Sequence, residues 1–380
     1  LEMAVSRGGD QVVVDKNGVD LKFYGGKTEA VEKKNKIQVR LYSNSLSNVI
    51  RASSNVLIMG HVNSDMDSVG SALGVKAICN ALKVPSQIVY DLKLSEKKTK
   101  LAVSSLFSKD EYDDIFILPK NALNKINGKT LVVCVDFHRA SLAMSKDVID
   151  ACSKIAIIDH HRRSEEFIDS PIFTYVDSSA SSAGELVTEL IQYSSVNPPI
   201  DIPSNYATLM LAGIFVDTNF YKSASTGART FEASMILRRF GADNIMADNF
   251  LKDDYEERAL INKILTTIKT PYNGIVYCLS PDDLDVDPVI LSKAANECIS
   301  IKGVSASFVI GRTQPNEIKI SARSDGSVNV QILCERIGIG GGHFALAASS
   351  IKDSNVADVE TLLLETLKEH LEEARNNREN

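Results

Sequence analysis

The stretch VLIMGHVNSDMDSVG at residues 56–70 decides the fold, because an apolar run passes through polar residues into a helical pattern. The run predicts a buried β-strand over Asn55–Met59, and the residues that follow predict a helix over Ser68–Leu82. A strand, a polar loop and a helix in this order are the repeating element of an α/β domain. The loop carries His61, Asp65 and Asp67, and Asp67 could serve as the cap of the helix.

The same alternation continues over residues 41–241. Apolar runs predict further strands at Gln87–Tyr90, Thr130–Val135, Lys154–Ile158 and Ile172–Val176. Helical patterns follow at Gly184–Tyr193, Tyr206–Val216 and Thr230–Phe240. Because strands alternate with helices, we expect the α/β class, with a mainly parallel sheet and helices on both faces.

Three other segments surround this domain. Residues 1–40 contain two short strand-like runs that predict a hairpin, the remnant of a preceding domain. Residues 242–269 are rich in helix formers and predict a helical linker. Residues 270–380 predict a smaller α/β domain, with strands at Gly274–Ser280, Ser307–Gly311 and Glu317–Ser321 and helices at Val328–Arg336 and Val356–Arg375.

The overall composition limits the classes of function. The 380 residues carry a formal net charge of −7, which argues against a partner such as long nucleic acid and favours a small substrate. No apolar run is long enough to cross a bilayer, so we expect no membrane contact by this chain itself. The six cysteines form no C-x-x-C pair, as is typical of buried, reduced thiols in the cytoplasm.

Acidic and histidine residues follow the apolar segments at four places. His61 begins the first group, Asp136 follows the third strand, Asp159-His160-His161 follows the fourth, and Asp217 ends an apolar helix. Taken alone, each acid could be a helix cap and each histidine an ordinary hydrogen-bonding residue. Since the carboxyl ends of parallel strands share one crevice, however, the side chains would repel one another unless cations neutralised them. Carboxylate and imidazole ligands without thiolate suit manganese or a related hard-to-borderline metal, and two such ions about 3.5–4 Å apart are a usual device for hydrolysing phosphate esters.

These four groups, in this order, resemble the motifs of the DHH phosphoesterase superfamily. The resemblance implies that His61, Asp65 and Asp136 hold one Mn²⁺ ion. It implies that a second Mn²⁺ is held by Asp67, Asp136, His160 and Asp217, with Asp136 bridging the two ions. By the same resemblance Asp136 is catalytic, His161 faces the substrate phosphate, and Asp159 supports the neighbouring histidine.

The last domain is similar to the DHH-associated substrate-binding domain. Gly340-Gly341-Gly342-His343 predicts a glycine-rich turn ahead of an Ala-rich helix, where backbone amides can approach a phosphate or a base. Such a turn also occurs for purely structural reasons. In the family, the glycine motif and the preceding arginine contact the nucleotide, which implies substrate-binding roles for Ser321, Arg323, Gly340, Gly341, Gly342 and His343.

The N-terminal segment indicates the type of DHH enzyme. SRGGDQVV at residues 6–13 and FYGGKT at 23–28 resemble the end of the degenerate GGDEF domain of GdpP-type proteins. VDFHRASL at 135–142 and GARTF at 227–231 are also similar to stretches of that family. The resemblance implies a cyclic-di-AMP phosphodiesterase that opens one 3′,5′-phosphodiester to give linear 5′-pApA. It also implies a homodimer and a cytoplasmic portion of a protein that is membrane-anchored in full length.

Three other functions are weighed against this one. A nanoRNase or pAp phosphatase would use the same metals on short linear nucleotides, and the N-terminal segment argues against it. A non-catalytic nucleotide-sensing module would bind without turnover, and the presence of all six metal-ligating residues argues against it. A processive exonuclease is disfavoured by the acidic composition. The residues do not decide between cyclic-di-AMP and cyclic-di-GMP.

Overall fold

The computed structural model describes residues 11–16, 20–25, 36–223, 225–281 and 283–379. The chain divides into two compact units, Leu1–Lys252 and Asp253–Asn380. The domain boundaries expected from the sequence at residues 41, 241 and 270 stay predictions. Among the described residues, no helix has the length and apolar character needed to cross a membrane.

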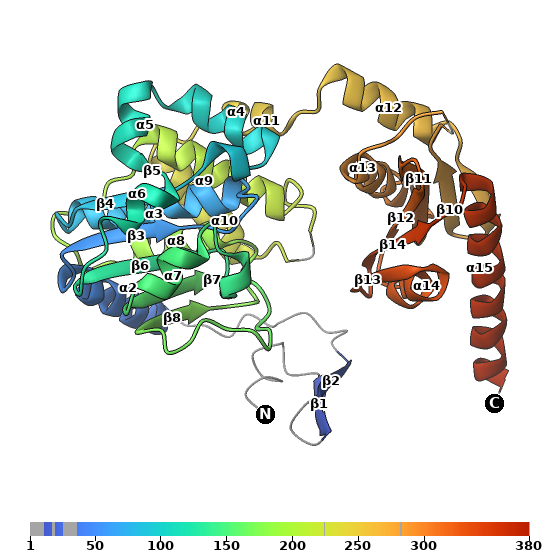
Figure 1. Cartoon of the computed structure of the whole chain (residues 1–380), viewed down its shortest axis with the longest axis horizontal. Coiled ribbons are helices and arrows are strands. Elements are labelled where there is room, and N and C mark those ends of the chain that lie inside the picture. Colours follow the sequence, from blue (N-terminus) through green and yellow to red (C-terminus); the bar gives the residue numbers. More distant parts are fainter. Residues whose placement is uncertain (1–10, 17–19, 26–35, 224, 282, 380) are drawn as a thin grey trace. The chain divides into compact units, whose positions relative to one another are not determined.

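The first unit is built on a parallel six-stranded sheet with the order β5-β4-β3-β6-β7-β8 (Figure 1). Its strands are β3 (Asn55–Met59), β4 (Ser86–Val89), β5 (Phe116–Ile117), β6 (Thr130–Val135), β7 (Ile155–Asp159) and β8 (Phe173–Val176). The chain runs outward from β3 to β5 and then returns to β6 on the other side of β3. Because crossovers are right-handed, this reversal puts the connecting helices on opposite faces of the sheet. The expected fold class is confirmed.

Helices cover the sheet and complete the unit. They are α2 (Lys36–Arg51), α3 (Met66–Ala81), α4 (Lys97–Leu106), α5 (Lys109–Ile115), α6 (Pro119–Leu123), α7 (Lys146–Ala151), α8 (Ala183–Gln192), α9 (Ser204–Asp217), α10 (Ala228–Arg239) and α11 (Asn244–Leu251), with short 3-10 turns η1 (Leu92–Leu94) and η2 (Ala140–Leu142). Helices α3 and α9 are buried almost all round, as expected of helices packed between other layers. The two helices pack closely at Gly70, where an added methyl carbon would lie 2.8 Å from the Cα atom of Met210.

The N-terminal hairpin expected from the sequence is confirmed as a pair of strands. β1 (Gln11–Lys16) and β2 (Asp20–Gly25) pair antiparallel, with Val13 opposite Phe23. The turn expected at Gly18 and the GGD segment at residues 8–10 lie outside the described residues.

The second unit contains a mixed sheet with the order β13-β14-β12-β11-β10-β9. Its elements are α12 (Tyr255–Leu265), β9 (Lys269–Tyr272), β10 (Ile275–Leu279), α13 (Pro288–Ile299), β11 (Ala306–Gln314), β12 (Glu317–Ser324), α14 (Val330–Ile337), β13 (Ile339–His343), β14 (Leu346–Lys352) and α15 (Val356–Glu379). Alternate residues of β10 enter different cores: Ile275 and Tyr277 pack with α14 and α15, whereas Val276 and Cys278 pack with α12 and α13. The sheet therefore lies between two helical layers.

Two expectations need correction in detail. The linker expected as one helix consists of α11 and α12, which bury apolar residues in different cores: Ala247 and Phe250 in that of the first unit, Ile261 and Ile264 in that of the second. Residues 252–254 separate the two helices.

The prediction of a glycine-rich turn followed by an Ala-rich helix is wrong. Gly340–Gly342 lie in β13, which pairs antiparallel with β14, and residues 346–352 form that strand instead of a helix. Ala347 and Ser349 are buried while Leu346 and Ala348 are exposed, the alternation of a strand. A methyl carbon on Gly340 would lie 2.5 Å from the carbonyl oxygen of Cys334, so the glycines let β13 lie close against α14.

Candidate metal centre

The carboxyl ends of three neighbouring strands supply the histidine and aspartate residues. Met59 at the end of β3 lies beside Cys134 of β6, and Cys134 lies beside Ile157 of β7. The residues just beyond these strand ends therefore meet at one edge of the sheet. Because the strand order reverses between β3 and β6, this edge is the topological switch point, where open α/β sheets bind their ligands.

Asp136 lies at the centre of the cluster. Its Oδ2 atom is 3.3 Å from Nε2 of His61, and its Oδ1 atom is 3.3 Å from Nε2 of His160. The residue directly follows β6 and has a φ of +66°, an uncommon value for a side chain other than glycine. Such a conformation costs free energy and is typical of functional sites. Each carboxylate oxygen thus faces a different histidine, the arrangement needed for a bridging ligand.

His61, Asp65 and Asp136 form a first group that could hold a cation. Nδ1 of His61 lies 2.7 Å from the carbonyl oxygen of Val62, which can only accept, so Nδ1 carries a proton. Nε2 of the neutral ring then presents a lone pair toward two carboxylates, at 3.3 Å from Asp136 and 3.8 Å from Asp65. This contact is repulsive unless a cation lies between them. Asp65 also caps α3 by accepting from the amide of Ser68, so the capping role considered for Asp67 belongs to Asp65.

Asp67, His160 and Asp217 form a second group. Asp67 is fully buried, and its two oxygens accept from the amides of Ala183 (2.7 Å) and Gly184 (2.9 Å) at the start of α8. Asp217 is the last residue of α9, with Oδ2 3.3 Å from Nε2 of His160. The structure thus brings together all six residues that the sequence predicts as metal ligands.

The protonation of these groups indicates a missing positive charge. Burial and the charge of Asp136 raise the pKa of Asp67 to about 7, and burial also raises that of Asp217 well above its usual value. Burial opposes protonation of His61, but its bonds to Asp136 and Asp65 raise the pKa to about 11. Among the described residues, Oδ1 of Asp136 and Oδ2 of Asp217 are buried without a hydrogen-bond partner. Bound cations would satisfy these atoms, so the donor set fits two divalent ions.

His161 and Asp159 lie beside the cluster. Oδ1 of Asp159 accepts from Nδ1 of His161 at 2.8 Å and from its backbone amide at 3.1 Å. Asp159 is fully buried, whereas the side chain of His161 is 55% exposed. Burial opposes ionisation of Asp159, but its bonds to His138 and His161 lower its pKa below the usual range. Asp136, His160 and His161 also form a third group that could hold a cation, since Nδ1 of His161 is 3.6 Å from Asp136.

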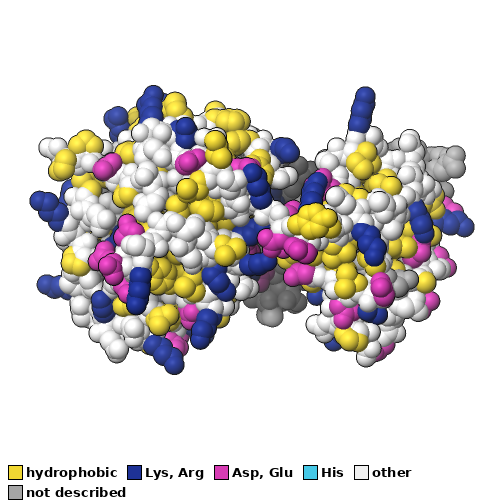
Figure 2. All heavy atoms as spheres, turned by 90° about the horizontal axis from the view of Figure 1, so that it is seen from above, with side chains coloured by type: hydrophobic (Ala, Val, Ile, Leu, Met, Phe, Trp, Pro, Cys, Tyr) yellow, Lys and Arg dark blue, Asp and Glu magenta, His cyan; other side chains and the backbone are white. Residues whose placement is uncertain are grey.

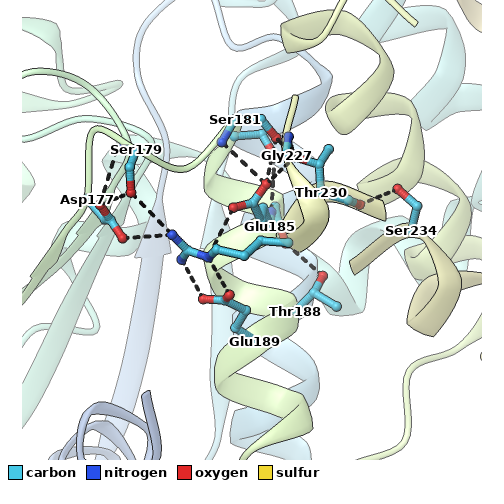
Figure 3. Close-up of polar contacts among 12 residues, drawn as sticks. Asp177, Ser179, Ser181, Glu185, Thr188, Glu189, Gly227, Thr230 and Ser234 are labelled. Carbon is cyan, nitrogen blue, oxygen red and sulfur yellow. Dashed lines mark hydrogen bonds and ion pairs between the residues drawn. The ribbon is translucent and has the colours of Figure 1, made fainter. Parts of the chain in front are cut away.

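A network of polar contacts surrounds α8 and the start of α10 (Figure 3). Arg229, near the start of α10, binds Glu189 through two bonds of 2.7 Å and Asp177 at 3.0 Å. Thr230 donates to Glu185 of α8 at 2.7 Å. These contacts join α8, α10 and the loop after β8, and so fix the first turn of α8, whose amides hold a proposed metal ligand.

The substrate-binding residues expected in the second unit lie on neighbouring strands. Gly341 is paired with Ala348, which is paired with Ser321 of β12. Leu346 of β14 pairs with His343 of β13 on one side and with Arg323 of β12 on the other, so one strand separates the backbones of His343 and Arg323. The side chain of His343 lies outside the described residues.

Arg323 is held by helix α13, which the sequence analysis missed. Its guanidinium donates to Asn296 (2.8 Å), to Ser292 and to the carbonyl oxygen of Ala322 (2.9 Å). Asp287 caps α13 and Pro288 occupies its first turn, a start signal that could have revealed the helix. His138, which binds Asp159, was quoted within a motif but given no role.

Comparison with known families agrees with the site. The model of the DHH family, N-terminal domain, matches residues 55–214, and that of the DHHA1 domain matches residues 272–373. The chain therefore contains a DHH domain followed by a DHHA1 domain.

Among its relatives, the chain is 36% identical to cyclic-di-AMP phosphodiesterase PdeA of Listeria monocytogenes, covering 97% of this chain and 55% of that protein. It is 38% identical to cyclic-di-AMP phosphodiesterase GdpP of Bacillus subtilis, covering 98% and 56%. The chain thus spans just over half the length of these relatives. An exopolyphosphatase-related protein of Bacteroides fragilis has the same fold, with a TM-score of 0.70, 19% identity and coverage of 87% of this chain and 96% of that protein.

Proposed function

We propose that this chain is a metal-dependent phosphodiesterase that opens cyclic-di-AMP to linear 5′-pApA. The observation that carries the proposal is Asp136, whose two oxygens each face a histidine of a different ligand group. The similarity to PdeA and GdpP, named as cyclic-di-AMP phosphodiesterases, supports the choice of substrate.

In this proposal the six ligands hold two Mn²⁺ ions. His61, Asp65 and Asp136 would hold one ion, and Asp67, Asp136, His160 and Asp217 would hold the other. When bound, the ions lower the pKa of a water molecule and stabilise negative charge on the phosphoryl oxygens. The oxygen and imidazole donors favour Mn²⁺, because no thiolate contributes to either group.

The remaining residues act on the substrate. Attack of water on one phosphorus forms a P–O bond while the bond to the 3′-oxygen breaks, and the second diester stays intact in pApA. His161 keeps a proton on Nδ1 for Asp159 and turns Nε2 outward. When Nε2 is also protonated, it donates to the phosphoryl group or gives that proton to the leaving oxygen. In the second unit, Arg323 and β13 are the proposed substrate contacts, through charge and backbone amides.

A small substrate agrees with the charge distribution. On the face drawn in Figure 2, Lys and Arg side chains are scattered among acidic and uncharged ones. Together with the net charge of −7, this pattern argues against tracking of long nucleic acid.

Product analysis tests the proposal. The chain is mixed with cyclic-di-AMP and Mn²⁺, with and without chelator, and pApA is tested in parallel by chromatography. We expect conversion of cyclic-di-AMP to pApA that stops there and requires the metal. Asp136→Ala should abolish turnover, whereas Asp201→Ala, at an exposed carboxylate of the same unit, should leave it unchanged. If the cyclic compound survives while pApA falls to AMP, the substrate assignment is wrong.

A further inference from the structure

His138 lies beneath the Asp159-His160-His161 segment and belongs to none of the three ligand groups. The residue is buried, with 3% of its surface exposed, and its Nδ1 atom forms a hydrogen bond with Oδ2 of Asp159. The other oxygen of Asp159 accepts from Nδ1 of His161 at 2.8 Å. One buried carboxylate therefore joins two imidazole rings, of which only that of His161 reaches the surface.

The contacts of His138 define which nitrogen carries the proton. The backbone amide of Ser164 donates to Nε2 at 3.1 Å, so Nε2 is an acceptor. The hydroxyl oxygen of Ser164 lies 3.0 Å from Nε2, but its hydrogen is donated to the carbonyl oxygen of Glu166 at 2.6 Å, so the backbone amide is the donor to Nε2. Nδ1 therefore bears the hydrogen and donates it to Asp159. The ring of Phe167 stacks on the imidazole with centroids 5.2 Å apart, which restricts its rotation.

The consequence for Asp159 is a fixed orientation. Oδ2 receives the N–H of His138, and Oδ1 receives the ring and backbone N–H groups of His161. Without His138, the buried Oδ2 would lack a donor, and the carboxylate could turn away from His161 to find one. His161 would then lose the acceptor that holds its proton on Nδ1 and its Nε2 toward the outside.

We propose that His138 is a positioning residue, which holds Asp159 so that His161 presents the free Nε2 atom to the substrate. The proposal rests on the proposed function only in the role of His161. The competing explanation is structural: His138 would merely anchor the loop of residues 161–168 through Ser164 and Phe167.

Two matched variants separate these explanations. In His138→Asn the amide nitrogen replaces Nδ1 and keeps the donor to Asp159, but the acceptor for Ser164 is lost. In His138→Gln the side-chain oxygen replaces Nε2 and keeps the acceptor, but the donor to Asp159 is lost. Each variant removes the ring and one hydrogen bond, so we expect similar thermal stabilities.

Steady-state kinetics with cyclic-di-AMP and Mn²⁺ give the first readout. We expect His138→Gln to lower kcat by about 10- to 100-fold with little change in KM, the usual loss when a supporting partner of a site residue is removed. His138→Asn should keep kcat within about threefold of the wild type, since its donor to Asp159 remains. Equal losses in both variants, or a smaller loss in His138→Gln, would overturn the proposal.

A metal-free measurement separates this proposal from the function itself. The chain contains six histidines, and long-range spectra of ¹⁵N-histidine protein at mildly alkaline pH report the tautomer of each ring. We expect Nδ1–H on His138 and His161 in the wild type, Nδ1–H on His161 in His138→Asn, and a mixture in His138→Gln. An unchanged His161 in His138→Gln, or Nε2–H on His138 in the wild type, refutes the proposal. A wild type that leaves cyclic-di-AMP intact refutes the proposed function instead, and these spectra then decide on His138.

Discussion

Gly213→Ala tests whether the close contact between α9 and α3 sets the geometry of the second ligand group. A methyl carbon on Gly213 would lie 2.6 Å from Cα of Asp67, 2.9 Å from its backbone nitrogen and 3.0 Å from Oδ1. Carbon atoms pack at about 3.5–4.0 Å, so the two helices must separate by roughly 1 Å. Metal–ligand distances tolerate only about 0.2 Å, and α9 also carries Asp217. Overpacking of this kind costs about 1–3 kcal/mol.

We therefore expect metal-free Gly213→Ala to have a lower urea midpoint. We also expect Mn²⁺ binding, measured by calorimetry, to be roughly tenfold weaker, which corresponds to about 1.4 kcal/mol of strain at the ligands. Gly128→Ala is the neutral control, because Gly128 is exposed and has no heavy atom within 4 Å of the added carbon. Gly74→Ala is the packing control, since its added carbon would meet the side-chain ends of Val187 (2.6 Å) and Met210 (2.7 Å), which can move. Wild-type Mn²⁺ affinity in Gly213→Ala, together with reduced stability, would refute the geometric argument.

Three further predictions concern charge. Arg229→Met should lower the free energy of unfolding of the first unit in urea by about 3–5 kcal/mol, because the buried Glu189 loses its cationic partner. Adding Glu189→Gln should restore part of this loss. Unaltered stability of Arg229→Met would contradict the role of the network. Since the metal-free pKa values of His61 and Asp67 are about 11 and 7 and ligands bind deprotonated, metal binding at neutral pH should release protons and weaken as the pH falls. Calorimetric heats that do not depend on the buffer would contradict this. Arg323→Ala should raise KM with little change in kcat, and an equal fall in kcat would contradict a binding role.

The strands that the sequence predicted best are those with continuous apolar runs. Asn55–Met59 and Thr130–Val135 agree with the observed bounds because central parallel strands are buried on both faces and end where polar residues begin. Strand β5 has only two residues and carries too little pattern to predict. Strands β13 and β14 consist largely of glycine, alanine and serine, so pairing and the packing of α14 decide their structure, and propensity does not.

The residues predicted as ligands were accessible to sequence analysis because they lie at the end of an apolar strand or helix or in the polar segment that follows it. The groups that orient these ligands could not be predicted from the sequence. Asp67 is held by amides 116 and 117 residues further along the chain, and no local pattern links these positions. His138 resembles any histidine near a strand end until its contacts with Asp159 and Ser164 are known.

The electrostatics of Asp67 explain why the polar network that holds α8 should affect metal binding. A buried carboxylate beside Asp136 is unfavourable, and the raised pKa of Asp67 expresses this cost. The two amides at the start of α8 and the positive end of its dipole offset part of it and favour the ionised form that binds a cation. Arg229 holds α8 through Glu189, so a change at Arg229 should reach the second ligand group through this helix. Weaker metal binding in Arg229→Met, with the first ligand group unaffected, is therefore the expected sign that the network orients Asp67.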